Sequence, residues 1–179
     1  MGLEQEIADL YIHEAGGMLR YAAALAPDGD IARDAVQEAF FRLFVCRSGG
    51  QSIASPKAWL FRVVRNYILD QRKAGARNTS SLESLLNVAG PALTDGGVHT
   101  SELLTVLPRI GLSPREIECV RLRTEDLRYE EIASVLGLQA GTVGALLARA
   151  HEKIRNAVSQ KKKSGMFAGT LAREKRYAS

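Results

Sequence analysis

The sequence SPKAWLFRVVRNYILDQRKAGAR, residues Ser55–Arg77, decides how the rest of the chain is interpreted. Ser55 is a helix-capping residue type, and Pro56 suits the first helical position, where its missing N–H would be unpaired in any case. Apolar residues then recur at three- and four-residue spacing, which predicts a helix with one apolar stripe and a buried tryptophan as its anchor. The stripe consists of Trp59, Leu60, Val63, Val64 and Tyr67 or Ile68.

The opposite side of this expected helix is strongly basic. Residues 56–77 contain six Lys and Arg residues against one acidic residue, whereas the whole chain has a net charge of +4. Such a face is either merely solvated or lies against nucleic acid, where Arg and Lys neutralise phosphates and Asn reaches a base edge. The polar residues off the stripe are Arg62, Arg65, Asn66, Arg72 and Lys73.

The composition excludes several classes of protein. A chain of 179 residues with 46% hydrophobic and 25% charged residues is typical of a soluble globular protein of one or two domains. No apolar run approaches the roughly 20 residues of a membrane span, and the acidic start lacks the order of a signal peptide, so we expect a cytoplasmic protein without membrane contact. The two cysteines and three histidines lack metal-ligand spacing, and no catalytic constellation is present, so we expect no metal, no cofactor, no small-molecule substrate and no enzyme activity.

The sign of the charge changes along the chain. Residues 1–50 carry four basic and eight acidic groups, whereas residues 160–179 carry six basic groups and one acidic group. Basic charge is therefore concentrated in the 56–77 segment and in the tail. This distribution is expected of a nucleic-acid binder that also has an acidic, protein-facing part.

Two helices are predicted before the basic one. Apolar spacing from Leu3 to about Ala26 indicates a helix, with a kink or break at Gly16-Gly17. After a turn in which Asp28 or Asp30 caps the next helix, residues 31–45 form an amphipathic pattern. Its polar side, with an exposed aromatic residue, is typical of a protein-docking surface, although a merely solvated face is commoner. That side carries Asp34, Gln37, Glu38, Phe41 and Arg42.

The second half of the chain predicts a helix-turn-helix. A short helix over 101–110 precedes Ser113-Pro114-Arg115-Glu116, which forms a capping-box signature. A short helix over 129–136 is stopped by Gly137, and a further helix follows a brief turn. Two short helices joined by a tight turn with glycine are typical of DNA-binding domains, and an ordinary helical hairpin is the alternative.

These elements predict an all-α fold of two small helical domains joined by a flexible linker. The first domain spans residues 1–77 and the linker, rich in Gly, Ser, Thr and Asn, spans 78–100. The helix-turn-helix domain spans 101–160, and the basic tail, 161–179, is expected to be disordered.

Three separated stretches resemble one family, the bacterial sigma factors of the extracytoplasmic-function type, which are initiation subunits of RNA polymerase. DGDIARDAVQEAFFRLF at 28–44 is similar to the family's DAEDLVQEVFLRLW, and PKAWLFRVVRNYILDQRK at 56–73 is similar to F-x-x-WLFRIARNLAIDxxRR. LSPREIECVRLRTEDLRYEEIASVLGLQAGTV at 112–143 is similar to LPPREREVLLLRxxEGLSYEEIAEILGISEGTV. Their order and spacing agree, and the resemblance covers nearly the whole chain except its last twenty residues.

The resemblance implies a function and a set of site residues. It implies a subunit that directs polymerase to specific promoters, helps to open them, and is held in check by an anti-sigma factor. Asp34, Gln37, Glu38, Phe41 and Arg42 would dock on the clamp helices of the polymerase's largest subunit. Arg62, Arg65 and Asn66 would lie along the promoter's -10 element, with Arg72 and Lys73 on backbone phosphates. The second domain would be of the winged-helix-like, sigma region-four type.

The expected recognition helix departs from the family pattern GTVKSRLHRAR. This chain has Gly144, Ala145 and Leu146 where the family has Lys, Ser and Arg, and Gly and Ala offer no donor to a base edge. The residues of the helix-turn-helix domain that remain for bases or phosphates are Arg115, Thr142, Arg149 and Lys153.

Two other functions stay open at this point. LSPREIECVRL also resembles the opening of LuxR-like helix-turn-helix regulators, although residues 1–77 show no receiver pattern. A sigma-like decoy or interaction protein with weakened recognition of the upstream -35 element is the third possibility, because of the apolar Gly144–Ala148 run.

Overall fold

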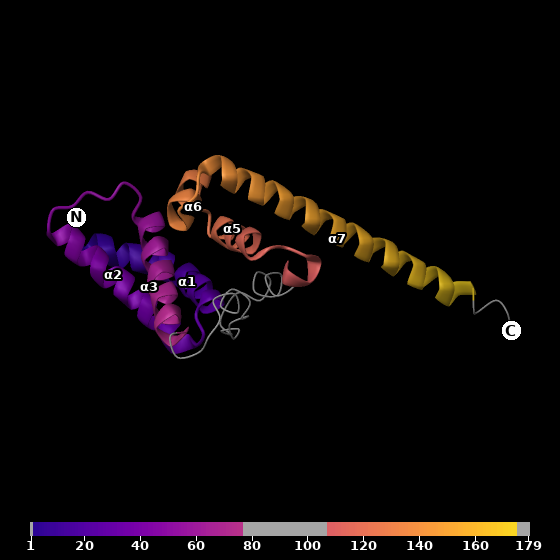
Figure 1. The fold of residues 1–179 in the computed structure, drawn as a ribbon, viewed down its shortest axis with the longest axis horizontal. Coiled ribbons are helices and arrows are strands. Elements are labelled where there is room, and N and C mark those ends of the chain that lie inside the picture. Colours follow the sequence, from indigo (N-terminus) through magenta and orange to yellow (C-terminus); the bar gives the residue numbers. More distant parts are fainter. Residues whose placement is uncertain (1, 77–106, 175–179) are drawn as a thin grey trace.

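The structure is a computed structural model that describes residues 2–76 and 107–174. All regular elements in these two stretches are helices, which confirms the predicted all-α class. Three long helices, α1 (Leu3–Leu25), α2 (Gly29–Ser48) and α3 (Pro56–Ala76), form one group. The second group consists of the 3-10 turn η2 (Leu107–Ile110), α5 (Pro114–Thr124), α6 (Tyr129–Leu136) and α7 (Ala140–Glu174), the last of which projects far from the rest (Figure 1).

Helix α1 is continuous, so the predicted kink or break at Gly16-Gly17 is wrong. Glycine within a helix costs roughly 1 kcal/mol relative to alanine. Packing offsets this cost, because Met18, Tyr21 and Ala22 on the next turn are fully or almost fully buried. Gly17 itself is buried, and a side chain there would collide with the carboxylate of Glu125 from the second group of helices.

The local start signals of α2 and α3 act as predicted. Asp28 caps α2 by accepting a hydrogen bond from the Ile31 N–H at 2.8 Å, which decides between the two candidate caps. Ser55 Oγ accepts a hydrogen bond from the Ala58 N–H at 3.4 Å at the start of α3. The short polar side chains thereby satisfy backbone donors that the helix itself leaves unpaired.

The buried stripe of α3 differs from the predicted one at two positions, Phe61 and Trp59. Phe61, which is absent from the predicted stripe, is fully buried and meets the Tyr21 ring edge-on at 5.4 Å between centroids. Trp59 is only half-buried, so it is not the buried anchor that the sequence predicts. The helix lies between α1 and α2 on one side and α6 on the other, which widens its buried face. The fully buried residues of α3 are Leu60, Phe61, Val64 and Ile68.

The second group contains the predicted helix-turn-helix. Gly137 ends α6 in the left-handed conformation with φ of 67°, a region that glycine occupies without steric cost. The axes of α6 and of α7 up to Gln160 then differ by a bend of 103°, within the range of helix-turn-helix units. The predicted helix over 101–110 is described only from residue 107 on, where it is the turn η2, and the linker 78–100 lies outside the described residues.

Helix α7 is longer than the sequence predicts. Its backbone continues to Glu174 and so includes most of the tail that was expected to be disordered. The segment contains no proline, and extending a helix that has already formed costs far less than starting one. Among the described residues, no single helix is long and apolar enough to cross a membrane, and only the bent α6–α7 pair has that length and composition.

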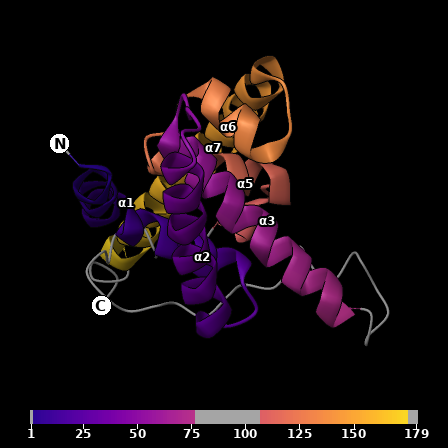
Figure 2. The ribbon, with the colours of Figure 1, turned by 90° about the vertical axis from the view of Figure 1, so that its left-hand side faces the viewer.

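The two groups pack against each other instead of standing apart. One hydrophobic cluster includes Tyr21 and Phe61 of the first group together with Cys119, Leu122 and Ile132 of the second. Helix α6 lies beside the start of α3, as two views of the molecule show (Figures 1 and 2). A second, smaller cluster lies wholly within the second group and joins η2, α5 and α7 through Leu107, Leu112, Ile117 and Ala150.

The capping box at the start of α5 gives a stability prediction. The Glu116 N–H donates to Ser113 Oγ at 3.3 Å and the Ser113 N–H donates to Glu116 Oε2 at 2.7 Å. We expect Ser113→Ala to lower the free energy of unfolding by about 1 kcal/mol, because a helix N–H loses its partner. Urea unfolding followed by circular dichroism measures the change. Ser134→Ala, at an exposed position of α6, is the control, and an equal effect of both substitutions would contradict the prediction.

Candidate polymerase and nucleic-acid interfaces

The outward side of α2 brings together the residues predicted to bind protein. The Phe41 ring is 63% exposed, and the Arg42 Nε donates to Glu38 Oε1 at 2.6 Å one helical turn away. Such exposure of a large aromatic ring within a charged surface is a common feature of protein-binding sites. Four of the five predicted residues line one surface hollow with a residue of α3: Asp34, Gln37, Glu38, Phe41 and Tyr67.

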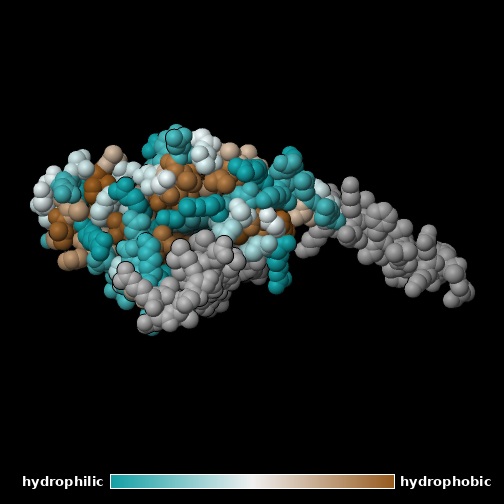
Figure 3. All heavy atoms as spheres, in the orientation of Figure 1, coloured by the Kyte–Doolittle hydropathy of each residue, from teal (hydrophilic) through white to brown (hydrophobic). Residues whose placement is uncertain are grey.

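This surface extends further than the sequence indicates. Phe44 lies one helical turn after the buried Phe40, yet it is 39% exposed, and Val45 is also exposed. Tyr11 of α1 is half-exposed and packs edge-on against Phe40 of α2, with 4.9 Å between ring centroids. Hydrophobic residues accordingly show at the left-hand end of the molecule in Figure 3. Periodicity alone missed this extension because it does not show where α1 and α3 cease to cover α2.

The predicted basic face of α3 is divided into an exposed part and a covered part. Arg62, Asn66 and Lys73 are exposed and recur at helical spacing along one side. Lys73 lies 3.7 Å from Asp70 in an ion pair that is open to solvent and therefore contributes little stability. These three side chains form a surface that is open to a polyanion.

Arg65 and Arg72 do not belong to the open surface. The Arg65 Nε donates to Glu118 Oε1 of α5 at 2.8 Å, and both side chains are largely buried. Burial opposes the charge of Arg65, but the hydrogen bond and the charge of Glu118 outweigh it and raise the pKa of the guanidinium. Arg72 is buried as well, and burial lowers its pKa. The expectation of one continuous exposed face is wrong, because the pattern of α3 does not show that α5 and α6 pack beside it.

The helix-turn-helix keeps three of its four predicted contact residues on the surface. Arg115, Thr142 and Arg149 are exposed, and the Arg149 Nε donates to the Ala145 carbonyl at 3.3 Å. Lys153 differs, because its Nζ binds Glu116 Oε2 at 2.8 Å and the Gly111 carbonyl at 3.0 Å. Burial raises the pKa of Glu116, but Lys153 and Ser113 together lower it below its usual value. Lys153 thus holds α7 onto α5 and is not directed outward.

Tyr129 is a surface residue that the sequence analysis did not single out. It is the first residue of α6 and is 43% exposed. Its ring edge lies 3.7 Å from the point where a Cβ on Gly144 would stand, so the ring covers the place of a longer residue in α7. Its hydroxyl is both a donor and an acceptor. The sequence feature that could have pointed to Tyr129 is Gly144, because a residue without a side chain leaves space for a neighbouring ring.

Two family models match the chain in the order in which the two groups of helices follow each other. The model for Sigma-70 region 2 matches residues 10–78, which include the end of α1 and all of α2 and α3. The model for Sigma-70, region 4 matches residues 111–154, which include α5, α6 and the start of α7. The chain belongs to the sigma-70 family. Together the two matches cover more than half of its length.

Relatives and solved structures agree with this assignment. The ECF RNA polymerase sigma-E factor of Escherichia coli K12 is 28% identical over 162 residues, covering 83% of this chain and 82% of that protein. The RNA polymerase sigma-E factor of Streptomyces avermitilis is 29% identical over 160 residues, covering 89% and 87%. This chain is therefore a sigma factor of the extracytoplasmic-function (ECF) type, as the sequence resemblance implied.

The fold is also that of known sigma factors. The sigma factor RpoE of Bartonella quintana, solved in complex with the anti-sigma factor NepR, superposes with a TM-score of 0.66 at 19% identity, over 87% of this chain and 98% of that one. CnrH, solved with the cytosolic domain of CnrY, gives a TM-score of 0.57 at 18% identity, over 89% and 91%. At these identities the likeness concerns the fold alone.

Tyr129 provides a test of the helix-turn-helix surface in this sigma factor. We expect Tyr129→Ala to weaken binding of the polymerase holoenzyme to a complete promoter about ten-fold, because a ring beside the recognition helix is lost. Tyr129→Phe separates the effect of the hydroxyl from that of the ring. Electrophoretic mobility shifts measure the affinity.

The control is a shortened promoter fragment that contains the -10 element but lacks the -35 region. Binding to this shortened fragment is expected to be the same for Tyr129→Ala and the wild type. An equal loss on both fragments, or no loss on the complete promoter, would show that Tyr129 has no role in contacting upstream DNA.

Proposed function

We propose that this sigma factor docks on core RNA polymerase through α2 and binds and helps to melt the promoter's -10 element through the outward face of α3. That it directs RNA polymerase to promoters follows from its family. The observation that carries the finer assignment is the pair of open surfaces on adjacent helices, one acidic and aromatic and the other basic. The chain itself carries out no chemistry in this proposal and acts as a non-enzymatic DNA-binding factor.

The α2 surface suits a basic partner with apolar pockets. Asp34 and Glu38 supply negative charge, and Phe41, almost one turn after Glu38, supplies an exposed ring beside them. Charge complementarity speeds and orients association, while a buried aromatic ring contributes much of the affinity at an interface. We assign the clamp helices of the polymerase's largest subunit as the partner of Asp34, Gln37, Glu38, Phe41 and Arg42.

The α3 surface suits separated DNA strands. Arg62 and Lys73 neutralise phosphates, and Asn66, one turn beyond Arg62, offers an amide to the edge of an unstacked base. Holding unstacked bases offsets a cost of a few kcal/mol per base for opening the duplex. In this way binding energy assists melting. Arg65 and Arg72 join this surface only where the second group of helices moves off α3.

The helix-turn-helix contributes mainly through phosphates and shape. Arg115, Thr142 and Arg149 position the domain on upstream DNA, whereas Gly144 and Ala145 supply no donor for direct base recognition. Recognition of the -35 element is therefore the weaker part of promoter selection. An anti-sigma factor is the proposed negative regulator, and the cytoplasm, where polymerase acts, is the proposed location. The LuxR-like and decoy alternatives are not favoured, because the family match extends over both groups of helices.

Transcription in vitro tests the proposed function. Core polymerase, the purified chain and a library of genomic promoter fragments are expected to give promoter-dependent RNA, and the absence of such RNA would contradict the proposal. The same assay identifies the promoters for the experiments on variants.

Charge reversal on α2 tests the docking surface. We expect the double variant Asp34→Lys, Glu38→Lys to bind core polymerase about ten-fold more weakly, because repulsion replaces attraction at a basic partner. Biolayer interferometry with immobilised core enzyme measures the affinity, and circular dichroism confirms the fold. Glu152→Lys, at an exposed position of α7, controls for reversed charge elsewhere. Equal affinity of the double variant and the wild type would remove the assignment.

Asn66→Ala tests the melting surface. Because the amide is assigned to an unstacked base, we expect this variant to reduce open-complex formation about ten-fold and initial duplex binding much less. Permanganate footprinting reports strand opening, and mobility shifts report binding of the holoenzyme to duplex DNA. Gln71→Ala, on an exposed position of the same helix, is the matched control. If Asn66→Ala lowers both quantities equally, Asn66 has no special role in melting.

A further inference from the structure

Glu118 of α5 is the centre of the contact between the two groups of helices. Its Oε1 accepts hydrogen bonds from the Tyr21 hydroxyl at 3.1 Å and from the Arg65 Nε at 2.8 Å. Glu118 is 8% exposed, and its partners come from α1 and α3 of region 2. Burial, with the charge of Glu118, raises the pKa of Tyr21 well above its usual value, so the phenol is a neutral donor. A carboxylate of region 4 therefore neutralises an arginine that region 2 would present to DNA.

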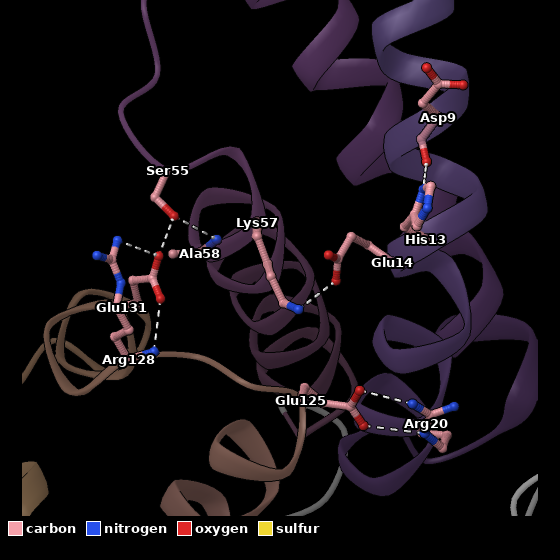
Figure 4. A network of polar contacts seen from close by, with 10 residues as sticks. All are labelled: Asp9, His13, Glu14, Arg20, Ser55, Lys57, Ala58, Glu125, Arg128 and Glu131. Atoms are coloured by element: carbon pink, nitrogen blue, oxygen red, sulfur yellow. Dashed lines mark hydrogen bonds and ion pairs between the residues drawn. The ribbon is translucent and has the colours of Figure 1, made fainter.

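Two further carboxylates of region 4 bind region 2 at the rim of this contact. Glu125 accepts two hydrogen bonds from Arg20 of α1, at 3.2 Å and 2.9 Å, beside the bare backbone of Gly17 (Figure 4). Glu131 Oε1 accepts a hydrogen bond from Ser55 Oγ at 2.8 Å, at the start of α3. We call Glu118, Glu125 and Glu131 the interdomain latch. Glu118 and Glu125 each pair with an arginine of region 2, whereas Glu131 pairs with Arg128 of its own region and accepts one hydrogen bond from the Ser55 hydroxyl of region 2.

Positive charge exceeds negative charge at the centre of the contact. Arg121 of α5 donates from Nη1 to the Ala24 carbonyl at 3.2 Å, while its buried Nε has no hydrogen-bond partner. Burial lowers the pKa of Arg121 and of Arg72, and the charge of Glu118 acts against that shift in both. Glu118 thus faces the buried guanidinium groups of both Arg65 and Arg121. A partner richer in negative charge, such as a nucleic-acid backbone, would satisfy these cations better.

We propose that region 4 of this sigma factor covers part of the α3 surface that is assigned to the promoter's -10 element. In this arrangement Glu118 binds Arg65 in the place that a DNA phosphate would take. The closed arrangement and binding of DNA to Arg65 then exclude each other, because one guanidinium edge cannot serve both partners. Arg62, Asn66 and Lys73 stay exposed in the closed form, but Arg65 is available to DNA only in the open form. The part of the DNA affinity that depends on Arg65 is therefore reduced by the open fraction. This inference rests on the proposed DNA-facing role of Arg65.

The test uses the full-length chain without polymerase. Small-angle X-ray scattering measures its radius of gyration, and fluorescence anisotropy measures its affinity for a fluorescein-labelled single-stranded DNA of mixed sequence. We expect Glu118→Gln to increase the radius of gyration, because the charge-assisted bond to Arg65 is lost. We expect its DNA affinity to rise about five-fold, as for a chain that is about 80% closed before the substitution.

Glu130→Gln is the matched control, since it removes the same charge from an exposed position of region 4. A rise in DNA affinity that Glu130→Gln shares would be a general charge effect, and it would overturn the proposal. No change in either measurement for Glu118→Gln would overturn it as well.

Two more variants keep the proposal testable if Glu118→Gln unfolds. Arg20→Ala removes the partner of Glu125 at a half-exposed position and is also expected to open the chain and strengthen DNA binding. The exchange Arg65→Glu with Glu118→Arg is expected to restore a compact chain whose DNA affinity does not exceed that of the wild type. An Arg20→Ala chain as compact and as weakly binding as the wild type contradicts the latch.

Transcription in vitro separates this inference from the proposed function. If the wild-type chain gives promoter-dependent RNA while Glu118→Gln changes neither compactness nor DNA affinity, the latch is wrong and the proposed function stands. If Glu118→Gln opens the chain and strengthens DNA binding but no promoter-dependent RNA forms with polymerase, the proposed function fails and the latch stands.

Discussion

The fold depends on α3, because this one helix packs against α1 and α2 with one side and against α6 with another. Its fully buried residues, among them Phe61 and Val64, hold α1 and α2 together. Each buried side chain of this size contributes about 2 kcal/mol by its removal from water, so the helix cannot rotate about its axis without a large loss. The exposed positions of Arg62 and Asn66 are therefore fixed by what the other side of α3 buries. The proposed DNA-binding surface is held in place because the opposite side of the same helix belongs to the hydrophobic core.

The same constraint explains how the two regions meet. Region 4 approaches α3 from a side that is already lined by arginine, and the contact is built from carboxylates as well as apolar residues. Purely apolar interfaces resemble a domain core, whereas contacts between domains that separate are more polar. In the contact, Glu118 and Arg65 are each largely buried and are paired with each other. Pairing of this kind favours a contact that forms and dissolves without unfolding either region.

Sequence alone was sufficient wherever a feature is local. The caps at Asp28 and Ser113 and the stop at Gly137 depend on residues within one or two turns, and their outcome is the predicted one. The failures involve residues whose neighbours are distant in sequence. Gly17 leaves space for the Glu125 side chain of the second group of helices and does not break α1. Arg65 is not fully exposed because Glu118 lies beside it. The periodicity of one helix does not show which of its residues a second domain will cover.

The covalent connection determines how strong the contact between regions has to be. Thirty residues, 77–106, join α3 to η2, so closure of the two regions is an intramolecular event and involves no loss of the free motion of two separate proteins. The charge-assisted hydrogen bonds and the hydrophobic cluster shared by the two regions then favour the closed form without that loss. A partner that binds both regions at separate places opposes closure only by its greater affinity for the open form.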